Sequence, residues 1–275
     1  MKKTILFLSI PLFILIVLSS GTGLYLHGFY SRESNAWALQ ARCQDAFDLF
    51  IAAPILLASL VMSVKGSRIA MEVLGGVFTY ASYTYVVYCF AVHLNAMFVV
   101  YCLALGLSFY SLLLHFYERA RTSRPDVLPK GWVIRTAGIY FIAVSSFFYF
   151  VWLSQLIPAM YRGVTPADLL DAGIPVNPVH VLDLSVCLPA LIVTGISLLR
   201  RNPVASVFAG PFLVFCCLME LTIAFLLFSS WQAGDGQTAA GILVFTIVAA
   251  GDALLFILFE RESARTQRSH TEAIA

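Results

Sequence analysis

Eight apolar stretches, each long enough to cross a lipid bilayer as a helix, run almost without interruption along this chain. The hydrocarbon core of a bilayer is spanned by about 20 consecutive apolar residues. The stretches cover residues 4–27, 46–64, 69–91, 96–117, 133–157, 180–199, 203–229 and 238–259. A chain that is 60% hydrophobic and only 12% charged has too little charge to cover a water-exposed surface. The sequence therefore predicts an all-α fold, a polytopic membrane helix bundle with eight transmembrane helices.

The basic residues alternate with the apolar stretches. With both termini placed in the cytoplasm, fourteen of the 17 Lys and Arg residues fall inside, and only Arg32, Arg42 and Arg162 fall outside. This distribution follows the positive-inside rule. We therefore expect a multi-pass protein of the cell (inner) membrane with cytoplasmic N- and C-termini. The lipid bilayer is its expected partner, and the basic residues are topology signals rather than contacts to nucleic acid.

The first stretch has a second interpretation. Its basic start and apolar run also suit a secretory signal peptide, whose removal would leave seven helices. However, no Ala-x-Ala cleavage site follows, and the apolar run continues through "GTGLYLHGFY". We expect the first helix to be retained.

A polar pattern occurs twice, in "DLFIAAPILLASLVMSVK" at 48–65 and in "DLSVCLPALIVTGISLLR" at 183–200. At a constant offset of 135 residues, four positions match: Asp48/Asp183, Pro54/Pro189, Ser59/Thr194 and Lys65/Arg200. Parallel repeats in one membrane need an even number of helices each. The pattern predicts a 4+4 parallel tandem duplication, with halves at 1–120 and 132–262, a cytoplasmic linker at 121–131 and a cytoplasmic tail at 263–275.

Four polar residues lie at the outer ends of the second and sixth stretches. Asp45 and Asp48 are three residues apart, as are His180 and Asp183, so each pair shares a helix face. If both faces line the duplication axis, these side chains and Asn95 form a polar cavity open to the outside. The Cα atoms of Asp48 and Asp183 would then lie within roughly 15 Å, because packed helices are about 8–10 Å apart.

Two interpretations of these four side chains remain open. Carboxylates and an imidazole on facing helices suit a divalent metal, so Asp45, Asp48, His180 and Asp183 are candidate ligands, although no cofactor is evident. Alternatively, they cap helices or form structural salt bridges.

Further acids lie along the later stretches. Glu220 and Asp252 fall deep inside the seventh and eighth stretches, where a charge is costly and usually functional. They are candidate proton carriers. Glu72, Glu260 and His115 fall near cytoplasmic ends, and we expect them to be interfacial.

The run "FTYASYTYVVYCF" at 78–90 places four tyrosines on the outer half of the third stretch. We expect some of them to belong to the interfacial aromatic belt and others to pack between helices. Several membrane functions lack their motifs: none of the eight stretches contains a lysine for a retinal Schiff base, and the chain has neither H-E-x-x-H nor a nucleotide-binding loop.

The chain resembles a family of small bacterial multi-pass membrane proteins. The resemblance rests on "QD" at 44–45 ahead of Pro54, on "NAMF" at 95–98, and on "VLDL" at 181–184 followed by Pro189. It implies no particular activity or catalytic residue, but it places Asp45 and Asp183 ahead of Asp48 as functional acids.

Three functions remain open. The first is a transporter or binding protein that takes a cation or small polar solute from the outer side. The second is a membrane-embedded enzyme acting on lipid or envelope precursors, and the third is a non-catalytic assembly or sensory protein. The sequence favours no particular oligomeric state.

Overall fold

The computed structural model describes residues 2–122, 128, 131–232, 234 and 239–274. Throughout this part of the chain the regular elements are helices, and no strand occurs in it. Eight of its helical segments are long and apolar enough to cross a membrane. The prediction of eight helices that are long and apolar enough to cross a membrane is therefore confirmed.

Two of the eight spans are interrupted, so their parts carry separate labels. The spans are α1 (Lys2–Tyr25), α2 and α3 (Asn35–Phe47 and Ala53–Val64), α4 (Arg68–Ala91), α5 (Phe98–Thr122), α6 (Trp132–Arg162), α8 and α9 (Pro178–Leu182 and Leu188–Leu199), α10 (Ala205–Gln232) and α11 (Ala239–Ile274). One short helix, α7 (Ala167–Ala172), lies in the connection between α6 and α8.

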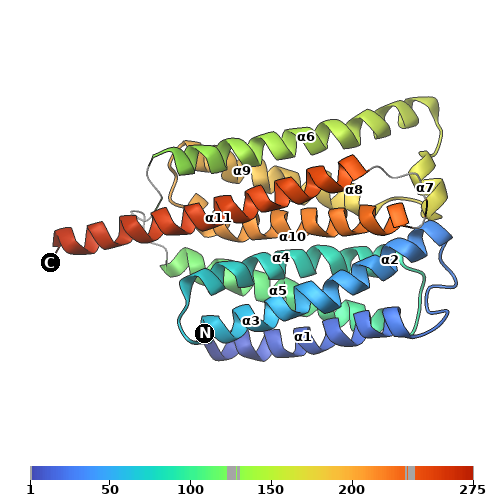
Figure 1. Cartoon of the computed structure of the whole chain (residues 1–275), viewed down its shortest axis with the longest axis horizontal. Helices are drawn as coiled ribbons and strands as arrows, with labels where there is room; N and C mark the ends of the chain where they lie inside the picture. The colour runs from blue at the N-terminus through green and yellow to red at the C-terminus, as the bar shows by residue number, and fades with distance from the viewer. Residues whose placement is uncertain (1, 123–127, 129–130, 233, 235–238, 275) are drawn as a thin grey trace.

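The spans run side by side along one direction, and both termini lie at the same end of the bundle (Figure 1). We call this the inner end and the opposite one the outer end, after the predicted orientation. The first four spans pack together on one side, and the last four pack together on the other. The two groups meet mainly where α4 packs against α10.

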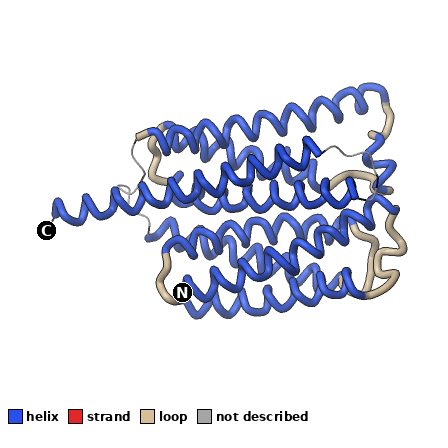
Figure 2. Tube along the Cα trace, viewed as in Figure 1, coloured by secondary structure: helices blue, strands red, loops and turns tan. Residues whose placement is uncertain are grey.

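The second and sixth spans each contain a π-helical turn that begins at one of the repeated acids. The turns are Asp48–Ala52 and Asp183–Cys187, and Figure 2 shows that both spans continue through them as helix. In each turn the carbonyl of the acid accepts a hydrogen bond from the backbone N–H five residues later, that of Ala53 or Leu188. Proline follows two residues after the end of each turn, at 54 and 189. Because proline lacks an N–H and its ring clashes with the carbonyl four residues earlier, an extra residue in the preceding turn relieves the clash.

The outer end departs from the predicted boundaries. The second span begins at Asn35 rather than at residue 46, since Ser34 caps α2 by accepting a hydrogen bond from the backbone N–H of Trp37. The helix α6 extends beyond the predicted residue 157 to Arg162, and Gly163 follows it with a φ of 64°, the left-handed conformation that suits glycine after a helix.

The inner end also differs from the sequence prediction. The helix α11 continues to Ile274, through the region predicted as the tail, whereas the apolar stretch ends at residue 259. The predicted linker at 121–131 falls largely outside the described residues, and α6 begins at Trp132, where the second half was predicted to start.

Candidate functional site

A cavity of about 480 Å³ lies between the two groups of four spans, toward the outer end. Its wall is formed by α2 and α4 on one side and by α6, α8, α9, α10 and α11 on the other. Gln40 near the start of α2 lines it and is exposed, so the cavity reaches the outer surface. Asp183 and Glu220 are the acidic side chains in its wall, and no described residue that lines it is basic.

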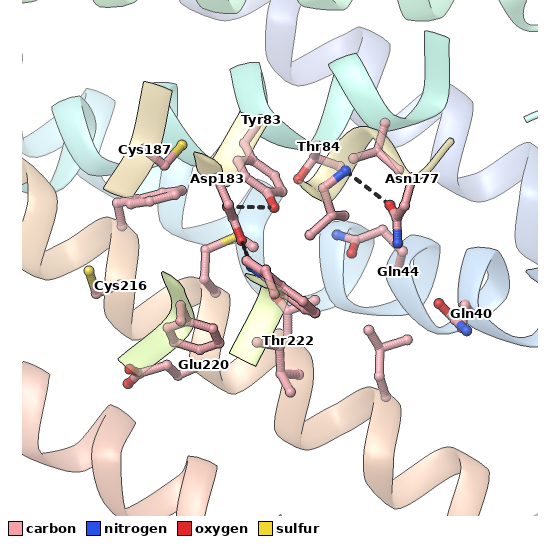
Figure 3. A pocket seen from close by; sticks show the side chains of 18 of the residues that line it. Gln40, Gln44, Tyr83, Thr84, Asn177, Asp183, Cys187, Cys216, Glu220 and Thr222 are labelled. Carbon is pink, nitrogen blue, oxygen red and sulfur yellow. Dashed lines mark hydrogen bonds between the residues drawn. The ribbon is translucent and has the colours of Figure 1, made fainter. Parts of the chain in front are cut away.

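Asp183 presents its carboxylate to this cavity from the π-helical turn of the sixth span. Its Oδ1 accepts a hydrogen bond of 3.0 Å from the hydroxyl of Tyr83 on α4, and its Oδ2 accepts one of 2.8 Å from the indole Nε1 of Trp152 on α6. Figure 3 shows the Tyr83 bond beside the cavity. The carboxylate is therefore held in place from two helices while remaining at the cavity wall.

Asp48 lies behind the wall and is buried. Its Oδ1 accepts from the hydroxyl of Tyr80 at 2.7 Å and from the side-chain amide of Gln44 at 3.0 Å. The Tyr80 hydroxyl also lies 3.2 Å from Oγ1 of Thr222 on α10. Because Gln44 and Thr222 line the cavity, Asp48 connects to the cavity through one layer of polar side chains.

Asp45 is 1% exposed and belongs to a separate group. Its Oδ2 accepts from the hydroxyl of Tyr30 at 2.6 Å, and its Oδ1 accepts from Tyr88 at 2.7 Å. Burial, together with the charge of Asp45, raises the pKa of Tyr30, which lies between the first two spans, so its hydroxyl remains a donor. Gly23 of α1 packs directly against this carboxylate.

His180 and Asn95 were predicted to join the same cavity, and neither is among its lining residues. The imidazole of His180 packs against the indole of Trp152, with ring centroids 4.6 Å apart and an interplanar angle of 52°, so it contacts a partner of Asp183. It lines a second cavity of about 580 Å³ beside α6, α7 and α8. The side chain of Asn95 accepts a hydrogen bond from the backbone N–H of Met97, just before α5 begins.

The tyrosines of the run 78–90 are buried between helices, and so the expectation that some belong to an interfacial belt is wrong. Three of them, at 80, 83 and 88, donate to the three acids Asp48, Asp183 and Asp45 respectively. Tyr80 and Tyr83 are three residues apart and share a face of α4, whereas Tyr83 and Tyr88 are five residues apart, so the tyrosines reach acids in different directions. The sequence signal for a tyrosine–carboxylate network was the concentration of tyrosines on the outer half of this span, at the same end as the acids.

Glu220 and Asp252 lie near each other on the neighbouring helices α10 and α11. The Tyr140 hydroxyl of α6 donates to Oε1 of Glu220 at 3.3 Å. Glu220 lines the cavity, whereas Asp252 is fully buried behind it.

The inner end of the interface between the two groups carries a charged cluster that the sequence interpretation missed. Glu72 of α4 is paired with Arg119 of α5, and Arg68 Nε lies 3.6 Å from Oε2 of Glu260 on α11. Both acids and His115 are buried within the bundle, which the sequence interpretation did not anticipate, and their interfacial depth stays a prediction.

Close helix packing explains this burial. A Cβ at Gly210 of α10 would lie 2.9 Å from Oε2 of Glu72 and 3.3 Å from Oε1 of Glu260, and one at Gly75 would overlap the ring of His115. Small residues allow membrane helices to approach in this way.

The predicted metal ligands Asp45, Asp48, His180 and Asp183 are thus distributed over separate contacts. Within the part of the chain that the structure describes, no group of three or more His, Cys, Asp and Glu side chains is arranged to hold a metal ion. No protein-family model, curated protein or solved structure matches the chain.

Proposed function

We propose that this integral membrane protein binds a small organic cation in the cavity between its two groups of spans and transports it from the outer side. The observation that carries the proposal is the Asp183 carboxylate in the wall of a cavity that has acidic but no basic lining among the described residues. The other side chains in the wall favour an organic cation over an inorganic one.

Aromatic and aliphatic side chains make up most of the wall. Tyr83, Phe148, Trp152 and Phe215 line it around Asp183. A cation over an aromatic face is stabilised by about 0.5–2 kcal/mol, and the stabilisation is larger where water is excluded. Pockets of several hundred Å³ with apolar walls and a few polar groups are typical of small organic ligands.

An inorganic cation fits this wall less well. Divalent ions need about six oxygen or nitrogen ligands or retained water, whereas both oxygens of Asp183 already accept hydrogen bonds from Trp152 and Tyr83. An alkylammonium group needs no ligand sphere. Charge attraction to one carboxylate and contact with aromatic rings are sufficient for it.

A transport role is supported by the arrangement of the two groups. In each group the first span packs against the second and the fourth, and the third packs against the fourth. Both groups also contain a π-helical turn, at Asp48 and at Asp183. We infer a 4+4 tandem duplication with its axis along the membrane normal, cytoplasmic termini and an inner-membrane location. Motion of one half against the other is the usual basis of alternating access in duplicated transporters.

Binding is tested with benzyltrimethylammonium and its neutral carbon isostere neopentylbenzene, on purified protein in lipid nanodiscs. The charged probe should bind, and the isostere of the same shape should bind at least tenfold more weakly. Asp183→Asn should weaken binding of the charged probe by about 10–100-fold, which corresponds to losing about 1.4–2.8 kcal/mol of attraction between the ammonium charge and the carboxylate.

Asp171→Asn is the matched control, because Asp171 lies on α7, is exposed and lines no part of the cavity. It should bind the probe as the native protein does. Equal binding of the charged and neutral probes would contradict the proposal. In proteoliposomes, uptake of the probe that depends on Asp183 supports transport; turnover of lipid or envelope precursors without uptake would instead favour an enzyme.

A further inference from the structure

Two buried acids from adjacent helices face each other beside the cavity. Asp252 of α11 is 0% exposed, and Glu220 of α10 is 4% exposed. The two carboxyl groups are close enough for each to influence the ionisation of the other, and Tyr140 of α6 lies beside them. Glu220 also belongs to the cavity wall, as Figure 3 shows.

The surroundings of this pair supply too few hydrogen-bond donors. Tyr140 donates to Oε1 of Glu220. Within the described part of the chain, neither oxygen of Asp252 nor Oε2 of Glu220 has a hydrogen-bond partner. An ionised carboxylate accepts hydrogen bonds only, and leaving it buried without donors is costly. A proton on one of the two carboxyls provides the missing donor.

The titratable groups around the pair also favour a proton on one of the two carboxyls. The other titratable groups that face it are Tyr140 of α6 and Cys216 and Cys217 of α10, and Asp183 of the sixth span lines the same cavity. None of these groups is basic. Two carboxylates this close cannot both stay ionised at low cost without a cation or a proton.

The inner end provides a comparison within the same protein. There the buried acids Glu72 and Glu260 are accompanied by the cations Arg119 and Arg68. That pair is neutralised by arginines, whereas the described surroundings of Glu220 and Asp252 offer no cation. The chain thus contains two buried acid pairs with different means of neutralisation.

We propose that Glu220 and Asp252 hold one proton between them, and that this proton leaves through the cavity when a cation binds beside Asp183. The release of this proton on cation binding rests on the proposed function. Glu220 lies in the cavity wall, so the proton passes from the pair to water in the cavity. One proton leaves for each monovalent cation that enters, so the total charge of the site is unchanged.

The proton is tested first in the ligand-free protein, by infrared spectroscopy of the carboxylic acid C=O band. The native protein at neutral pH should show this band, and it should shift in D2O and decrease as pH rises. Glu220→Gln and Asp252→Asn should each shift the band, and the double variant should lose it. Asp171→Asn, at an exposed acid of α7, should leave the band unchanged.

A native protein without the band, or single and double variants with the native band, would overturn the shared proton. Coupling is tested in weakly buffered solution with a pH indicator and benzyltrimethylammonium. At probe concentrations that saturate each protein, the native protein should release one proton per bound cation and the double variant should release none. Equal release by both would overturn the coupling. If the probe fails to bind at all, the proposed function is wrong. The infrared band still shows whether Glu220 and Asp252 share a proton, because it is measured without the probe.

Discussion

Replacing Gly23 by alanine tests the buried position of Asp45 most sharply. A Cβ at this position would overlap Oδ2 of Asp45 and stand 2.7 Å from the hydroxyl oxygen of Tyr30. The carboxylate must move away, which breaks its 2.6 Å hydrogen bond with Tyr30. Losing a hydrogen bond to a charged group costs about 1.5–3 kcal/mol, and overpacking costs about 1–3 kcal/mol.

Alanine also gains about 1 kcal/mol over glycine within a helix, so we expect a net loss of about 1.5–5 kcal/mol for Gly23→Ala. Gly21 of the same helix is the matched control, because a Cβ there meets nothing within 4 Å. Gly21→Ala should be neutral or stabilising. The assay is equilibrium unfolding of the purified protein in mixed micelles.

A double-mutant cycle assigns the cause of the loss. In the Asp45→Ala background the obstacle to a Cβ at Gly23 is removed, so Gly23→Ala should cost much less, with a coupling of about 1–3 kcal/mol. Equal free energies of unfolding for Gly23→Ala and Gly21→Ala, or no coupling with Asp45→Ala, would refute the placement of this carboxylate.

Three other variants or fusions test other parts of the fold. Gly210→Ala, which pushes a Cβ against the buried acids of the inner end, should destabilise the protein by about 1–3 kcal/mol in the same assay; Gly251→Ala, with open space around it, should not. Tyr80→Phe removes one of the two donors to Asp48 and should cost about 1–2 kcal/mol, whereas Tyr110→Phe, at an exposed position, should cost nothing measurable. Reporter fusions after residues 35, 95, 170 and 234 should all report the outside, and a cytoplasmic signal at any of them would contradict the topology.

The sequence predicted the spans well because the thickness of the bilayer sets their length. The repeated polar pattern coincides with the irregular turns, since Asp48 and Asp183 each precede a proline by six residues, but no irregular turn was predicted from it. The exact form of the irregularity, a π-helical turn that begins at the acid itself, depends on backbone hydrogen bonds that sequence spacing does not specify.

The partners of the acids were harder to predict. Asp183 is held by Tyr83 and Trp152, which are 100 and 31 residues away along the chain. Such contacts depend on how the spans pack, and hydrophobicity carries little information about packing. The burial of Glu72 and Glu260 was not predicted for a related reason. Apolar stretches end near these acids, but α4 and α11 both remain packed against α10 there.

The most direct test of the proposed function is the position of the ligand. A benzyltrimethylammonium derivative with bromine on its ring can be located by anomalous diffraction from crystals of the native protein. We predict bromine density inside the cavity between the two groups of spans, with the ammonium group beside the carboxylate of Asp183, and no such density in Asp183→Asn. Bromine found only at the lipid-facing surface, or in the cavity of both proteins alike, would contradict the account.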